Sequence, residues 1–156
     1  MVTHRATSVG RVTVGVGARR GATPEEVWEA VTRALREASA DGPVAVAALA
    51  TVDVRAGEPG LLAAARRLGV PLRAYPAGAL AAVHVPHPSR VVREAVGTPS
   101  VAEAAALLAS GEGARLLVTK RTAAAASGGG RGGPARVTVA VARPPGGPAA
   151  YGRVRR

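Results

Sequence analysis

The sequence predicts a layered α/β domain, and three observations support this prediction. Apolar runs of strand length alternate with segments whose apolar residues recur at helical spacing. Gly and Pro residues punctuate the boundaries between these segments. The chain has 156 residues, 47% of them hydrophobic, which suits one folded domain. Phe is absent and only one Trp and two Tyr are present, so we expect Val, Leu and Ala to fill a core with close helix–sheet packing.

The first half of the chain begins with a β-branched run at residues 12–16, expected to form a strand. A helix start follows, because Thr23 suits the N-cap, Pro24 the first helical position and Glu26 the third position of a capping box. This helix is expected to end near Gly42. The other expected elements of this half are a strand over 44–52 buried on both faces, a polar loop over 51–59, a helix over 61–68 and a strand over 72–75.

The second half contains a second predicted capping box, formed by Ser100 and Glu103, which leads a helix over residues 101–109. Strands are expected at 116–119 and 137–142, and because no helical segment separates them we expect an antiparallel pair. Before the capping box, a short helix or turn over 76–85 and a helical stretch from Pro88 to Gly97 are expected. The predicted organisation is a flexible tail over 1–10, a domain over 11–143 with a flexible Gly-rich loop over 123–134, and a flexible basic tail over 144–156.

An anion-binding loop is the first candidate site. The segment Gly15-Val-Gly-Ala-Arg-Arg-Gly21 lies between a predicted strand and a predicted helix. Backbone N–H groups of glycines and the N-terminus of a helix favour anions, and Arg19 and Arg20 add planar donors suited to carboxylate or phosphate. The segment lacks the GK[ST] of a P-loop. An ordinary tight turn with exposed arginines explains the same residues.

Carboxylates near strand and helix ends form the next candidates. Thr51, Asp53 and Glu58 follow the second predicted strand, where ligands of open α/β sheets bind. Asp53 and Glu58 suit the polar edge of a ligand or a general base, whereas Glu58 before Pro59 also suits the dipole of the next helix. Glu103 suits a general base only if a ligand displaces it from its own helix cap.

Composition excludes several classes of site. Cysteine is absent, which removes disulfides, thiolate nucleophiles and Cys-ligated metals. His84 and His87 are separated and followed by prolines and lack a third ligand, so no metal site is predicted. We expect a cytoplasmic protein, since the sequence has no signal-peptide pattern and no membrane span. The net charge of +11 favours a polyanionic partner; Arg143 and the arginines of 153–156 leave nucleic acid as a weaker alternative, because aromatic residues for base stacking are scarce.

The ordered set of motifs resembles the C-terminal domain of the cobalt-precorrin-5A hydrolase family, CbiG, and its stand-alone relatives of the CobE family. The resemblance covers about residues 12–143, and Arg55 departs from it by standing where the family usually has Lys. The matching segments are Gly15–Gly21, Thr51-Val-Asp53 with Glu58, 68–72, Pro88-Ser89, Gly97-Thr-Pro-Ser100-Val-Ala-Glu103, 116–120 and 137–143.

The resemblance implies a three-layer α/β/α fold with a mixed sheet of about five strands, and a place in cobalamin biosynthesis. One implied function is hydrolysis of a corrin-ring lactone with loss of acetaldehyde, with Glu103 or Glu58 as base. The alternative is a non-catalytic protein that binds and hands over the corrinoid. Neither requires a resident cofactor, cobalt being carried by the substrate, and other enzymes of the pathway are possible partners. The substrate-binding residues implied are Gly15, Gly17, Arg19, Arg20, Gly21, Thr51, Asp53, Ser89, Ser100 and Lys120.

Overall fold

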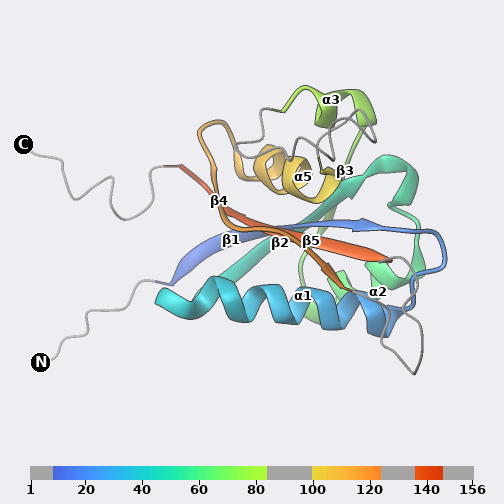
Figure 1. Ribbon diagram of the computed structural model, residues 1–156, viewed down its shortest axis with the longest axis horizontal. Coiled ribbons are helices and arrows are strands. Elements are labelled where there is room, and N and C mark those ends of the chain that lie inside the picture. Colours follow the sequence, from blue (N-terminus) through green and yellow to red (C-terminus); the bar gives the residue numbers. More distant parts are fainter. Residues whose placement is uncertain (1–8, 84–99, 124–135, 146–156) are drawn as a thin grey trace, which may run out of the picture.

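The computed structural model of the chain describes residues 9–83, 100–123 and 136–145 (Figure 1). Five strands form one sheet at its centre. The predicted helical stretch from Pro88 to Gly97, which includes Ser89, lies outside the described residues, and so do His84 and His87. The same holds for most of the predicted tails and of the loop over 123–134. The strands are β1 (Gly10–Ala18), β2 (Val44–Val52), β3 (Leu72–Tyr75), β4 (Arg115–Ala123) and β5 (Val137–Arg143).

The sheet is mixed, with the strand order β3-β2-β1-β5-β4. β1, β2 and β3 are parallel, whereas β5 is antiparallel to both of its neighbours, β1 and β4. The antiparallel pairing expected for the last two strands is therefore confirmed. Two antiparallel steps make β4 point the same way as β1, so β1 to β4 all end at one edge of the sheet, where β5 begins. We call this edge the carboxyl edge.

Helices cover both faces, giving the expected three-layer α/β/α arrangement (Figure 1). α1 and α2 lie on one face, joined by a cation–π contact in which the Arg67 guanidinium sits 4.0 Å from the centre of the Trp28 ring. α3 and α5 lie on the other. None of the helices in the described ranges is long and apolar enough to cross a membrane. The helices are α1 (Pro24–Ala38), α2 (Pro59–Leu68), α3 (Ala77–Ala81) and α5 (Val101–Ser110), with 3-10 turns η1 (Ser39–Asp41) and η2 (Asp53–Arg55).

The start of α1 follows from local chemistry, as predicted. Thr23 Oγ1 accepts a hydrogen bond from Glu26 N at 3.1 Å, and Glu26 Oε1 accepts one from Thr23 N at 3.0 Å. This capping box, with Pro24 at the first helical position, holds the helix directly after the turn that leaves β1. The helix ends at Ala38, before the expected Gly42, because the next residues tighten into η1.

The face of the sheet toward α1 and α2 is made of valines, and the opposite face is made of small residues. Alternate residues of β1 and β5 (Val12, Val14, Val16 and their β5 counterparts) are fully buried on the α1 side. Burial of each such side chain contributes roughly 1.5–3 kcal/mol. The residues between them, Gly15 and Gly17 in β1 and Ala140 and Ala142 in β5, face α5, which is itself rich in alanine.

Gly15 is the point of closest approach between α5 and the sheet. A Cβ atom built on Gly15 would lie 1.9 Å from the backbone oxygen of Ala102 and 2.7 Å from the backbone nitrogen of Ala106. Neither backbone atom can move without displacing the helix. The expectation of a Gly-rich turn beginning at Gly15 is therefore wrong: β1 continues to Ala18, and this glycine is required by packing.

The burial of β2 also differs from the expectation. Its second half, from Ala48, is buried on both faces, but in its first half half-buried Val44 and Val46 alternate with exposed Ala45 and Ala47. A register shift opposite Val12 and Thr13 separates the halves. The first half of β2 thus follows the pattern of a strand covered on one face only. The bounds of β2 are those expected, and Thr51, which also began the expected loop over 51–59, therefore lies in the strand.

We expect Gly15→Ala to destabilise the protein by about 3 kcal/mol or more, because the added methyl group overpacks a contact with helix backbone. Chemical denaturation followed by circular dichroism measures the change. Gly78→Ala is the control, since a Cβ there meets nothing within 4 Å and alanine favours the helix. Equal stability of Gly15→Ala and wild type would contradict the packing role.

Candidate functional site at the carboxyl edge

The turn after β1 presents two exposed arginines on a backbone that is held in place. Arg19 N donates to the carbonyl of Arg136 at 2.9 Å, and Ala22 N donates to the carbonyl of Arg19 at 3.1 Å. Gly21 has a φ of 86°, in the left-handed region that favours glycine. The side chains of Arg19 and Arg20 are exposed. This short turn, not the longer loop expected, is where an anion would meet guanidinium groups.

Glu58 is tied to this turn from the start of α2. Its Oε1 accepts a hydrogen bond from Gly21 N at 3.2 Å. Glu58 occupies the N-cap position of α2, the place at which it was expected to suit the dipole of that helix, but its side chain makes no capping hydrogen bond there. The carboxylate instead joins two loops of the carboxyl edge, and any role as a base would compete with that bond.

Arg136 completes the turn and is a residue that sequence reasoning missed. Its Nη1 donates to the carbonyl of Gly21 at 3.5 Å and lies 3.9 Å from Glu26 Oε1. Its position in the sequence, directly before the last strand, could have indicated this role. Because β5 is antiparallel to β1, the residue before β5 lies beside the end of β1.

Gly17 lies in β1, next to the first turn of α5. A Cβ there would lie 2.7 Å from Thr138 Oγ1 and 3.7 Å from Val101 Cβ. Gly17 also pairs with Thr138 in the ladder between β1 and β5, so the prediction that it is a loop residue is wrong. Its position nevertheless brings the N-terminus of α5 to the carboxyl edge.

Thr51 and Asp53 differ in their availability. Thr51 is 0% exposed, and its hydroxyl donates to the carbonyl of Val16 at 2.7 Å, so this hydroxyl links β2 to β1 inside the protein. Asp53 begins η2 and is exposed. Of the two, only Asp53 presents its side chain to solvent at this edge.

Glu103 is a buried carboxylate that bridges α5 and β4. It is 6% exposed, and its Oε2 accepts a hydrogen bond from Lys120 N at 2.8 Å. The Oγ of Ser100 accepts from Glu103 N at 3.2 Å, which is half of the predicted capping box. The other half is replaced, because the carboxylate is directed to β4 and not back to Ser100 N.

An irregularity in β4 explains why Lys120 N needs this partner. Val118 pairs with Val141 and Arg121 pairs with Val139, so β4 advances three residues where β5 advances two. The extra residue makes a β-bulge, in which Thr119 and Lys120 together lie opposite Ala140 and neither has a partner in the ladder. Glu103 satisfies the amide that the bulge leaves unpaired. Bulges re-aim side chains and often lie next to functional sites.

The structure therefore assembles two hydrogen-bonded groups at one edge of the sheet. The first contains Arg19, Gly21 and Glu58, with Arg20 beside them, and the second contains Ser100, Glu103 and Lys120. A Cβ built on Gly17, two residues before Arg19, would lie 3.7 Å from Val101 Cβ, so the end of β1 passes beside the first turn of α5. Three pockets lined wholly by described residues involve none of the predicted site residues. The described residues also contain no cluster of three or more metal-ligating side chains.

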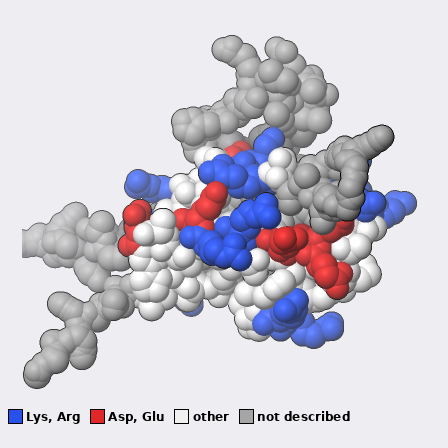
Figure 2. Space-filling model, turned by 60° about the horizontal axis from the view of Figure 1, so that its bottom comes forward, with Lys and Arg blue, Asp and Glu red and all other residues white. Residues whose placement is uncertain are grey.

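The face covered by α1 carries both signs of charge. Figure 2 shows basic and acidic side chains interspersed on it. Arg33 lies 3.8 Å from Glu29, and Arg121 Nε lies 3.0 Å from Glu37 Oε1. A continuous basic stripe, the usual footprint of nucleic-acid binding, is not what this face presents.

Comparison with known proteins identifies relatives. Residues 12–142 match the family described as "Cobalamin synthesis G C-terminus". The protein CobE of Sinorhizobium sp. is 38% identical over 109 residues, which cover 69% of this chain and 70% of that protein. A crystal structure of CobE, a protein from the cobalamin (vitamin B12) biosynthetic pathway, superposes with a TM-score of 0.63 at 30% identity, covering 91% of this chain and 98% of the other. The cobalamin biosynthesis protein chiG of Agrobacterium tumefaciens gives a TM-score of 0.58 at 32% identity, covering 85% and 98%.

We expect Glu103→Ala to lower stability by about 1–3 kcal/mol, since it leaves the Lys120 amide without its acceptor. Glu103→Gln, whose amide oxygen can still accept that bond, is the matched control and should stay within about 1 kcal/mol of wild type. Thermal and chemical denaturation of the three proteins measure both effects. Equal losses in the two variants would contradict the bridging role.

Proposed function

Because the chain belongs to the CbiG C-terminal/CobE family of cobalamin-biosynthesis proteins, we propose that it binds a carboxylate-bearing corrin-ring intermediate at its carboxyl edge. The observation that supports the proposal is that the pinned turn with exposed Arg19 and Arg20 lies beside the N-terminal end of α5, whose Glu103 holds the backbone of Lys120 in the bulge of β4. Corrin-ring intermediates carry several acetate and propionate groups, so they can engage several cations together.

The chemistry of recognition follows from the groups at this edge. Guanidinium groups bind carboxylates through two parallel hydrogen bonds, which gives orientation as well as charge neutralisation. The ammonium group of Lys120 acts as a point charge at a second position. Contacts at separated positions on one rigid macrocycle add without a further loss of translational freedom, so individually weak surface pairs can give useful affinity.

The geometry favours binding and hand-over without catalysis. Both proposed bases already accept hydrogen bonds from backbone amides, Glu103 from Lys120 and Glu58 from Gly21. Each carboxylate would have to exchange such a bond for one to water before it could act as a base. A carrier role requires only the cations and amides of the edge, together with a fixed backbone.

Hydrolysis is the second candidate, and the buried carboxylate of Glu103 favours it. A carboxylate that takes a proton from water would let the oxygen attack the lactone carbonyl, after which the ring C–O bond breaks and the proton passes to the leaving oxygen. Loss of acetaldehyde then requires cleavage of a carbon–carbon bond as the alcohol becomes an aldehyde, with a proton returning to the ring carbon. Glu103 lies at the N-terminus of α5, whose amides favour a developing oxyanion.

Replacing both exposed arginines tests the binding proposal. We expect Arg19→Ala combined with Arg20→Ala to weaken corrinoid binding by about tenfold or more, since two charged contacts are lost. The fold should be unaffected, because the hydrogen bonds of Arg19 to the rest of the turn come from its backbone. Titration followed by the visible spectrum of the corrinoid measures affinity.

The control for this experiment is Arg33→Ala combined with Arg36→Ala, which removes the same charge from exposed positions of α1. It should bind as wild type does, apart from a small general effect of net charge. Equal weakening by both double variants would show that binding depends on overall charge and would refute a site at the carboxyl edge.

An acetaldehyde assay with cobalt-precorrin-5A separates the two candidates. For a carrier, we expect a spectral change on mixing and no acetaldehyde from the wild type. For a hydrolase with Glu103 as base, the wild type releases acetaldehyde and Glu103→Gln loses at least about a hundredfold in rate while remaining folded. Release that survives in Glu103→Gln would exclude Glu103 as the base.

A further inference from the structure

One of these pockets lies at the edge of the sheet opposite the carboxyl edge, where β1 begins and β5 ends. Its volume is ≈ 230 Å³. This is smaller than the roughly 300–1,000 Å³ of pockets for drug-sized ligands, so it suits a small molecule. None of the residues of the carboxyl edge contributes to it. The lining residues are Gly10, Arg11, Val12, Ala38, Asp41, Gly42, Pro43, Val44, Leu117, Arg143 and Pro144.

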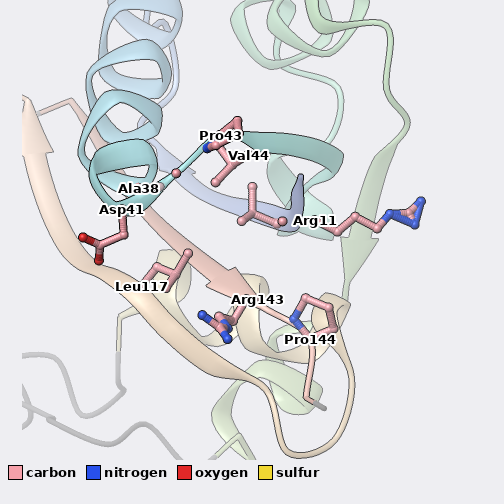
Figure 3. Close-up of a pocket in the computed structure, with 11 residues that line it drawn as sticks. Arg11, Ala38, Asp41, Pro43, Val44, Leu117, Arg143 and Pro144 are labelled. Atoms are coloured by element: carbon pink, nitrogen blue, oxygen red, sulfur yellow. The ribbon is translucent and has the colours of Figure 1, made fainter. Parts of the chain in front are cut away.

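The walls of this pocket are mostly apolar. Side chains of Val44 and Leu117 contribute to opposite sides of it, and Pro144 closes one end (Figure 3). Leu117 is 39% exposed, which is high for a leucine in a strand, and it lies at the first of the two register shifts of β4. The pocket therefore offers apolar surface that solvent reaches.

The pocket also contains a cation, Arg143, for which the described residues offer no partner. Arg143 is half-buried, and within residues 9–83, 100–123 and 136–145 it has neither an ion pair nor a side-chain hydrogen bond. Figure 3 shows its guanidinium between Leu117 and Pro144, whereas Arg11 points away and the carboxylate of Asp41 is directed to the far side of Leu117.

A second arginine increases the positive potential at this point. Arg115 of β4 is the register partner of Arg143 in β5, so the two Cβ atoms lie about 4.5–5.5 Å apart on the same face of the sheet. Like charges directly opposite each other destabilise a pair of strands. An anion bound between the guanidinium groups would remove that repulsion.

We propose that this pocket binds a small organic carboxylate with a short apolar chain. The carboxylate lies on Arg143, to which Arg115 adds positive potential from outside the lining, and the chain lies against Val44 and Leu117. A guanidinium matches the two oxygens of a carboxylate, and the neighbouring wall accepts a few methylene groups. The site is separate from the proposed corrinoid site, and the inference does not depend on it.

The carbonyl end of α1 is the competing partner for Arg143. Ala38 ends that helix at the pocket, and cations stabilise helix C-termini. The two roles predict opposite effects on the free protein. If Arg143 serves the helix, its removal lowers stability; if it is half of a repelling pair, its removal leaves stability equal or higher.

The probe is hexanoate, with hexan-1-ol as the uncharged molecule of the same length, titrated into the full chain and followed by NMR amide shifts. We expect hexanoate to shift the amides of residues 10–12, 42, 44 and 143 and to bind at least tenfold more tightly than hexan-1-ol. Arg143→Met should weaken hexanoate binding at least tenfold and should not lower the melting temperature. Arg73→Met, at an exposed position of β3, should leave affinity unchanged.

Three results would overturn the inference: no saturable shifts around the pocket, equal affinity for the two probes, or wild-type affinity in Arg143→Met. A lower melting temperature in Arg143→Met together with wild-type affinity would assign Arg143 to the end of α1. Arg115→Met is a second variant, which removes the charge of the exposed ladder partner of Arg143. It should weaken hexanoate binding less than Arg143→Met does.

Discussion

The contact between α5 and β1 determines most of what this structure can do. The backbone of Ala102 occupies the space that a side chain at Gly15 would fill, so the helix lies directly on the sheet. Small residues on both surfaces make this approach possible, and they are the reason that a chain without Phe can still form a dense core. The same contact determines how far α5 lies from the sheet, and therefore where its N-terminus lies.

The carboxyl edge is built on that contact. With α5 held close to the sheet, the carboxylate of Glu103 reaches the amide of Lys120 at 2.8 Å and fixes the bulge of β4. On the other side of the strand end, Glu58 and Arg136 hold the turn that carries Arg19 and Arg20. The carboxylates of Glu58 and Glu103 thus hold the backbone by hydrogen bonds, while the side chains of Arg19 and Arg20 remain exposed. Such a division suits recognition of a carboxylate-rich macrocycle more than acid–base catalysis.

Local chemistry made the layers and the start of α1 predictable. Thr23, Pro24 and Glu26 act within one turn of helix, and the strands show in short β-branched runs. Long-range contacts were not predictable in the same way. Gly15 has the local character of a turn residue, and its reason is a helix that begins more than eighty residues later. Glu103 has the spacing of a capping box, yet a bulge in a distant strand determines its partner. The position of Glu58 before α2 was predictable, but its hydrogen bond was not, since Gly21 comes from another loop.

The central claim is that corrinoids bind at the carboxyl edge, and mapping the contact surface tests it most directly. Backbone amide shifts recorded while a carboxylate-bearing corrinoid is added to the labelled protein should change most at residues 17–21, 100–103 and 120. The start of β1 and the residues of η1, at the other edge of the sheet, should stay unchanged. Changes concentrated away from the ends of β1 and β4, or spread evenly over the surface, would contradict the account.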